Sequence, residues 1–116
     1  MKKLSDFKDN SGIIVASKLL GIIMTILADE RNAALKDEKS PLQMFSKFME
    51  NSPAEMREIF AILSEQNPEE YHCDGAEAML NMLTLANDPV IIGLFISQRR
   101  TGDATSSASV SANTEE

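Results

Sequence analysis

The chain has 116 residues, of which 43% are hydrophobic and 25% charged, and this is the composition of one soluble globular domain. Aromatic residues make up only 5%, with no Trp, which disfavours both a large β-sandwich and a nucleic-acid module built on stacked aromatics. The formal net charge of −7 argues against general nucleic-acid binding, and one Cys with one His excludes a disulfide framework and any multi-Cys/His zinc site. We therefore expect no nucleic-acid partner, no metal and no cofactor.

The first apolar segment covers residues 13–28. It is about four residues shorter than a bilayer span and carries Lys18 in its middle, so we interpret it as a buried helix and not as a membrane span or signal peptide. Its polar residues Ser17, Lys18 and Thr25 fall in one wedge about 100° wide, which predicts a central helix packed by several neighbours. Residues 29–39 are charged and either extend this helix or form a short exposed one. We expect a cytoplasmic protein without a membrane partner.

Three pairs of a capping residue and proline predict the starts of further helices, because an N-cap oxygen precedes a proline at the first helical position. These pairs are Ser40-Pro41, Ser52-Pro53 and Asp88-Pro89. Ser52 and Asp74 are each followed by Glu three residues later, which is typical of a capping box.

Apolar residues recur at helical spacing behind each of these starts. The stripes are Leu42, Phe45 and Met49 with Phe48 beside them, then Met56, Ile59, Phe60 and Leu63, then Ala76, Met79, Leu80 and Leu83. We expect the second helix to end at Asn67-Pro68 and the third at Asn87 in a left-handed conformation. Residues 90–96 are apolar all round, and we interpret them as a helix because a lone strand would have no partner.

These elements predict an all-α fold, a single compact domain of five to six helices over residues 1–98. Residues 99–116 are predicted to form a disordered acidic tail rich in Ser, Thr and Ala. Val110 is the only sizeable apolar side chain after residue 100, so the stretch cannot offset its ordering entropy. Residues 101–116 carry three acidic and no basic residues, which leaves residues 1–100 mildly acidic with a formal charge of −4.

No group of residues predicts catalysis. His72, Cys73 and Asp74 are adjacent in the chain, whereas catalytic triads are assembled across a fold, so we interpret them as a loop in which Asp74 caps the next helix. Glu69 and Glu70 follow a proline and are typical of an acidic first turn or a solvated loop. The glycines are isolated, which excludes a glycine-rich phosphate loop. We predict that the protein is not an enzyme.

Methionine is abundant, with six internal residues at positions 24, 44, 49, 56, 79 and 82. Flexible Met side chains either fill gaps in a core or form surfaces that adapt to several partners. Met44, Phe45, Phe48 and Met49 cover more of a short helix than one core contact requires. We therefore expect part of this patch to be an exposed binding face.

The order of these features resembles the tail assembly chaperones of long-tailed phages and prophages of Gram-positive bacteria. The resemblance covers residues 1–98 in outline through short motifs, none of them unique to that family. The motifs are LSDFK at 4–8, EIFAIL at 58–63, NPEEY at 67–71, NDP at 87–89, Leu94-Phe95 and Ser97-Gln98 before a Ser/Thr/Ala-rich acidic tail. The stretch 29–50 matches least, and Asp9-Asn10 stands where the family often has a Gly-Glu pair.

The resemblance implies an all-helical, non-catalytic protein that works in the host cytoplasm during tail assembly and is absent from the finished virion. Its implied partners are the tape measure protein and the major tail protein, and self-association or a longer frameshifted form of the chain is a further option. Our hypothesis for the client-facing surface is the set Met44, Phe45, Phe48 and Met49 together with Ile91, Leu94 and Phe95. The alternative is a prophage-encoded adaptor or inhibitor of a host protein. A helix-turn-helix regulator is disfavoured because the candidate recognition helices hold too few basic residues.

Overall fold

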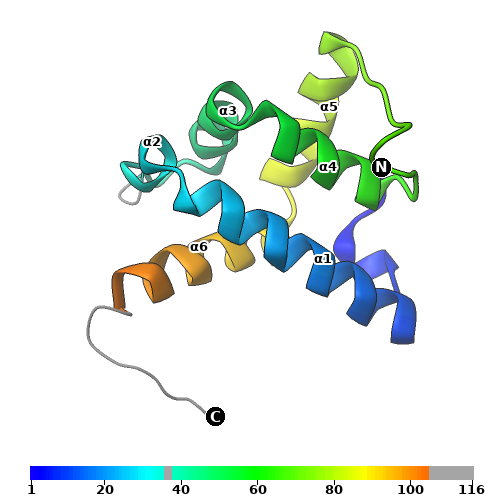
Figure 1. The fold of residues 1–116 in the computed structure, drawn as a ribbon, viewed down its shortest axis with the longest axis horizontal. Helices are drawn as coiled ribbons and strands as arrows, with labels where there is room; N and C mark the ends of the chain where they lie inside the picture. Colours follow the sequence, from blue (N-terminus) through cyan, green and yellow to red (C-terminus); the bar gives the residue numbers. More distant parts are fainter. Residues whose placement is uncertain (36–37, 105–116) are drawn as a thin grey trace.

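The computed structural model describes residues 1–35 and 38–104, with side chains as far as Gln98. Within these ranges the chain is all-helical and forms one compact unit, which confirms the predicted fold class. The elements, drawn in Figure 1, are the 3-10 turn η1 (Leu4–Asp6) and the helices α1 (Asp9–Ala28), α2 (Glu30–Ala33), α3 (Pro41–Asn51), α4 (Pro53–Leu63), α5 (Gly75–Ala86) and α6 (Pro89–Ala104).

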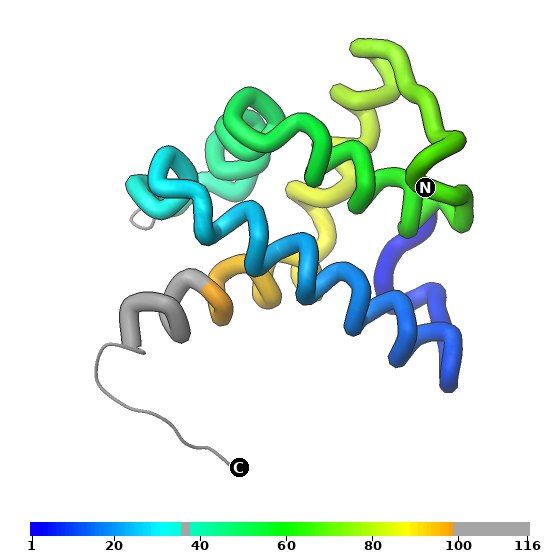
Figure 2. The backbone as a smooth tube through the Cα atoms, viewed as in Figure 1, coloured from blue at the N-terminus to red at the C-terminus, as the bar shows by residue number. Residues whose placement is uncertain are grey.

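The helices enclose one core between α1 and the rest of the molecule. Helix α4 packs along α1, α3 packs against both α4 and α5, and α6 lies against α1 and α5. The chain bends by 79° between α5 and α6, and the path through this bend can be followed in Figure 2. This bend lets two consecutive helices cover different parts of the core.

The helix starts agree with the predicted caps at three of four positions. Ser40 Oγ accepts a hydrogen bond from the Gln43 amide at 3.3 Å, and Asp74 Oδ1 accepts one from the Glu77 amide at 2.8 Å. Asp88 Oδ1 accepts from the Val90 amide at 3.0 Å. These bonds satisfy amides that have no partner inside the helix.

Ser52 is the fourth position, and its predicted capping role is wrong. Its side chain makes no cap hydrogen bond to α4, and its Oγ instead accepts a hydrogen bond from Asn32 Nδ2 at 2.9 Å. Asn32 also donates to the carbonyl of Ile26 at 2.8 Å and accepts from Asn51 Nδ2 at 3.0 Å. This buried junction joins the end of α1 to the α3–α4 connection, so the charged segment after residue 28 contains a structural anchor that its composition did not indicate.

Two predicted helix ends also differ. Helix α4 ends at Leu63, before Asn67-Pro68, and Glu65 takes the left-handed conformation with φ of 59°. The Gln66 amide then donates to the Ala61 carbonyl at 2.9 Å, which closes the helix end. Asn87 has φ of −107°, so it is not the left-handed residue that we predicted.

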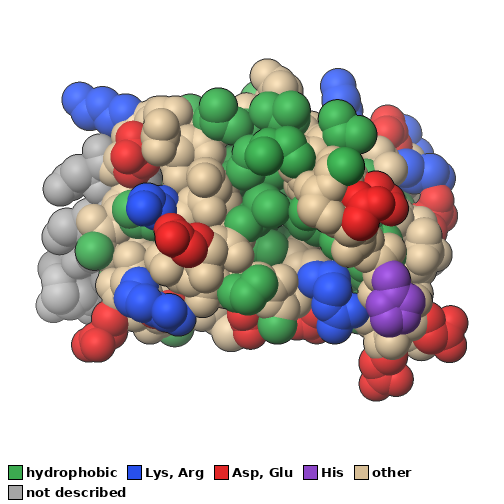
Figure 3. Space-filling view, turned by 90° about the horizontal axis from the view of Figure 1, so that it is seen from above, with side chains coloured by type: hydrophobic (Ala, Val, Ile, Leu, Met, Phe, Trp, Pro, Cys, Tyr) green, Lys and Arg blue, Asp and Glu red, His purple; other side chains and the backbone are tan. Residues whose placement is uncertain are grey.

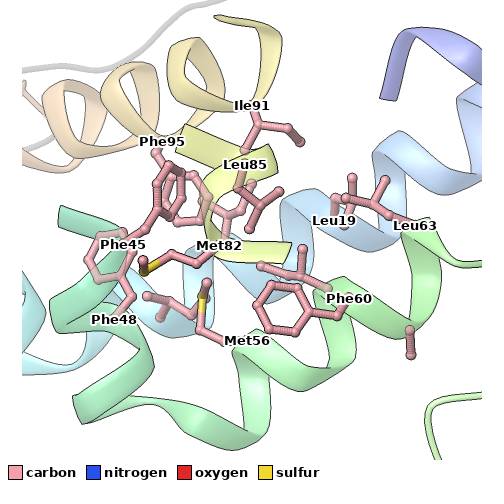
Figure 4. Packing of buried hydrophobic residues seen from close by; sticks show 14 of the residues in the cluster. Leu19, Phe45, Phe48, Met56, Phe60, Leu63, Met82, Leu85, Ile91 and Phe95 are labelled. Carbon is pink, nitrogen blue, oxygen red and sulfur yellow. The ribbon is translucent and has the colours of Figure 1, made fainter. Parts of the chain in front are cut away.

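The core consists of apolar side chains from α1, α3, α4, α5 and α6 together with Tyr71, and Figure 4 shows its packing. An aromatic cluster of Phe45, Phe48 and Phe95 lies at one end. The Phe45 and Phe95 rings meet edge to face, and the Phe48 and Phe95 rings stack, both with centroids 5.1 Å apart. These are favourable ring geometries, and they fasten α3 to α6.

Helix α1 differs from its prediction in length and in burial. It begins at Asp9, so it has 20 residues, and only Leu19, Ile23 and Ile26 are buried. Several elements pack against α1 as predicted, namely η1, α2, α4 and α6. The predicted burial is wrong, because most of the residues of α1 face solvent. Helix α1 is long and apolar enough to cross a membrane. The core helix of a soluble protein and an N-terminal signal sequence can have the same length and composition.

The predicted boundary at residue 98 falls inside α6, which extends to Ala104. The remainder of the predicted disordered tail, residues 105–116, lies outside the described residues.

Candidate protein-docking surface

The residues predicted to face a client lie mainly in the core. Met44, Phe45, Phe48, Ile91 and Phe95 are each at most 2% exposed, so the expectation that they form a surface patch is wrong.

Met49 and Leu94 are half-buried and pack against the same core cluster. The physical reason is the position of α3, which has α2, α4 and α5 as neighbours. A short helix enclosed on several sides needs a wide apolar face, and the breadth that suggested exposure instead serves packing.

The exposed apolar surface lies on α5. Met79, Leu80 and Leu83 are 53%, 63% and 38% exposed, and Ala76 is exposed one turn before them. Their spacing places all four on one side of the helix, and we call this set the α5 ridge. The ridge is the same stripe that the periodicity identified, but it faces solvent.

The opposite side of α5 packs into the core. Met82 and Leu85 are buried, and Ala78 and Ala86 are partly buried against the cluster. The helix thus carries two apolar stripes, with Met82 and Leu85 interleaved in sequence with the ridge residues. Periodicity alone could not rank the two stripes, although Met82 and Leu85 were a signal that a second one exists.

Polar contacts from α4 and α5 hold the loop before α5 in place and favour the inward orientation of the Met82 and Leu85 side. Asn81 Nδ2 donates to the Tyr71 hydroxyl at 3.1 Å, and Tyr71 is buried. Arg57 donates to the carbonyls of Pro68 at 2.8 Å and Tyr71 at 2.9 Å, which holds the loop before α5 against α4. Burial raises the pKa of the Tyr71 phenol above its ordinary value.

The surroundings of the ridge are also weakly polar. Glu77 is the only charged residue of α5, and Leu42 is 43% exposed on the neighbouring α3. The space-filling view of Figure 3 shows hydrophobic side chains gathered in a band on the face that carries α3, α4 and α5, with charged groups at its margins. Contiguous apolar surface with a polar rim is typical of a protein-binding site.

A groove lies between α1 and α4. This open groove has a volume of about 890 Å³, and its lining includes Phe7, Val15 and Ile22 on one side and Glu55, Glu58 and Glu65 on the other. Lys18 of α1 also lines the groove. Its mixture of one cation, several carboxylates and hydrocarbon defines no recognisable reaction chemistry.

The residues weighed for chemistry lie together in the loop before α5. His72 is exposed and Cys73 half-buried in the loop before α5, while Asp74 caps that helix. Among the described residues no group of three or more His, Cys, Asp or Glu side chains is arranged to hold a metal ion. The α5 ridge is the best-defined candidate site in the part of the chain that the structure describes.

Comparisons with known proteins add no assignment: no protein-family model, no curated protein and no solved structure matches this chain.

Proposed function

We propose that this protein is a phage tail assembly chaperone that binds the tape measure protein through the α5 ridge. In this proposal it also helps to recruit subunits of the major tail protein, and it works in the cytoplasm of the bacterial host. The observation that carries the proposal is the outward display of three large apolar side chains on one helix of a well-packed fold. The choice of client rests on the family resemblance of the sequence.

The ridge has the properties needed for a helical client. Its four residues lie at spacings of three, four and seven positions, so they present a row about 10 Å long at 1.5 Å per residue. An amphipathic client helix laid along this row would bury Met79, Leu80 and Leu83 with its own apolar side chains. Burial of apolar area of this kind stabilises a complex by about 25 cal/mol per Å² before the costs of association.

Met79 gives the surface tolerance for different client segments. Its unbranched thioether side chain adapts to irregular partners, which suits a chaperone that must cover many turns of a long helical protein. The net negative charge of the chain keeps the uncomplexed protein soluble despite the exposed apolar row.

The experiment is co-expression with a tape measure protein encoded in the same genome, followed by affinity purification. The ridge variant Met79→Gln, Leu80→Gln, Leu83→Gln keeps good helix formers on α5 while removing the apolar row. We expect co-purification and the solubility of the tape measure protein to fall at least tenfold, with the circular-dichroism spectrum of the chaperone unchanged.

A matched control places the same three glutamines on α1, as Ile13→Gln, Leu20→Gln and Met24→Gln, which are also exposed. This control should retain the client. Equal client binding by the ridge variant and the unmodified chain would refute the docking assignment. If instead a host protein co-purifies through the ridge while the tape measure protein does not, the adaptor alternative replaces the chaperone proposal.

A further inference from the structure

The methionine side chains of this fold lie in two different environments. Met44, Met56 and Met82 are at most 6% exposed, and Figure 4 shows the sulfur atoms of Met56 and Met82 within the core. Met79 stands three residues before Met82 on the same helix, yet it is 53% exposed. Helix α5 thus holds one thioether in the core and presents another to solvent, inside the surface that we propose for client binding.

We propose that Met79 is an oxidation site that controls docking on the α5 ridge, with hydrogen peroxide as the oxidant. This inference rests on the proposed function, because it concerns the binding of the client to the ridge. The sulfur of Met79 takes one oxygen atom from the peroxide, whose O–O bond breaks. The proton of the transferred oxygen passes to the departing hydroxide, which leaves as water. The sulfur loses two electrons to the peroxide, and the product is methionine sulfoxide.

The sulfoxide places a polar oxygen in the middle of an apolar surface. Water can hydrogen-bond to this oxygen while the ridge is free, because Met79 is exposed. A client helix laid over the ridge would remove that water, and burial of a polar oxygen without a donor opposes binding. The other three ridge residues have apolar side chains and supply no donor. Oxidation should therefore act on the complex much more than on the free chain.

The polar side chains of α5 are already engaged elsewhere. Thr84 and Asn87 donate hydrogen bonds to backbone carbonyls of the same helix, at 3.1 and 2.8 Å. Asn81 donates to the hydroxyl of Tyr71. Glu77 is the only charged residue of the helix, and its carboxylate can only accept. Helix α5 therefore offers the sulfoxide oxygen no uncommitted hydroxyl and no cationic side chain.

Burial determines which thioethers the peroxide reaches first, since oxidation of methionine follows its accessibility. Met79 should react before the core residues Met44, Met56 and Met82. Met24 is 55% exposed on α1 and should react at a similar rate, but it lies outside the ridge. It therefore supplies a matched control for the effect of oxidation on binding.

Peptide mapping by mass spectrometry after graded peroxide treatment tests the first step. Dithiothreitol added afterwards returns the Cys73 thiol to its reduced form and leaves the sulfoxides in place. We expect sulfoxide to form at Met79 and Met24 at least about tenfold faster than at Met44 and Met82. Equal rates at Met79 and at the buried positions would overturn the proposal.

Client binding tests the second step. The purified chain is oxidised, freed of peroxide and added to a cell-free synthesis of the tape measure protein, so that the client never meets the oxidant. We expect the oxidised chain to retain no more than about a tenth of the client bound by the untreated chain, with an unchanged circular-dichroism spectrum. Methionine sulfoxide reductases should restore binding.

Two leucine variants identify the sulfur atom that matters. Met79→Leu keeps the ridge apolar and cannot be oxidised there, so it should retain the client after peroxide treatment. Met24→Leu should lose the client as the unmodified chain does. Loss of the client by oxidised Met79→Leu, or its retention by the oxidised unmodified chain, would overturn the proposal.

Failure of this inference can be distinguished from failure of the proposed function. If the untreated chain binds no client, the proposed function is wrong and the oxidation site falls with it. If the untreated and oxidised chains bind the client equally, only the oxidation site is refuted, and the assignment of the α5 ridge stands.

Discussion

The aromatic cluster and the α5 ridge are apolar groups of similar size in opposite environments. Phe45, Phe48 and Phe95 are fully buried and hold α3 against α6. Leu80 and Met79 on the ridge are more than half exposed. The difference shows that apolar character alone does not distinguish core residues from surface residues in this small fold, because burial depends on which side of each helix its neighbours cover.

Helix α3 contacts α2, α4 and α5, and its apolar residues are buried against these neighbours. Helix α5 contacts α3 and α6 and leaves its outer side open. Substitutions in the two regions should therefore affect different properties: stability in the cluster, and partner binding on the ridge.

The largest effect is expected from Phe48→Ala. This truncation leaves a cavity next to Phe45 and Phe95, and such changes cost about 3 to 5 kcal/mol of folding free energy. A small domain has only about 5 to 15 kcal/mol in total, so the variant should be largely destabilised. Urea denaturation followed by circular dichroism measures the loss. A cost below about 1 kcal/mol would mean that Phe48 is not part of a packed core.

The comparison also explains which parts of the molecule could be predicted from sequence. Helix starts depend on local chemistry, and the caps at Ser40, Asp74 and Asp88 were predictable because each bond joins residues at most three positions apart. The helix stripes were equally local, since periodicity is a property of one helix.

The candidate site was not predictable in this way, because exposure depends on how helices are arranged around each other. Periodicity identified the α5 ridge as a stripe but could not show that Met82 and Leu85 would be the buried side. It also could not show that Ser52 would bond to Asn32, twenty residues earlier, instead of capping its own helix. Both outcomes depend on contacts between segments distant in the chain.

An intermediate effect is expected from Tyr71→Phe, which tests what turns the ridge outward. The change removes the hydroxyl that accepts the hydrogen bond from Asn81, and the loss of such a bond costs about 0.5 to 1.5 kcal/mol. It leaves the aromatic ring in the core, so the fold should persist. Chemical denaturation at pH 7 gives the difference, and an unchanged free energy of unfolding would show that this bond does not help to orient α5.

The same tyrosine predicts a pH dependence. Burial raises the pKa of Tyr71 above its ordinary value of about 10, so the folded state keeps a proton that the unfolded state loses. The resulting stability is present below about pH 10 and is lost as the pH rises toward the folded-state pKa. Tyr71→Phe should lack this loss, and denaturation curves at pH 8 and pH 10.5 compare the two proteins.

The smallest effect on stability is expected from Leu80→Ala, the counterpart of Phe48→Ala on the ridge. Leu80 is 63% exposed, so truncation removes little buried area, and Ala is at least as good a helix former as Leu. The free energy of unfolding should change by no more than about 0.5 kcal/mol, as for most surface substitutions. Client binding should nevertheless weaken, because Leu80 is the most exposed apolar side chain of the ridge.

A decrease of several kcal/mol in the free energy of unfolding would instead place Leu80 in the core and remove the contrast between the two regions. Retained stability with weakened client binding would show that the ridge is apolar for the sake of a partner, since an apolar row that serves neither packing nor binding only promotes aggregation.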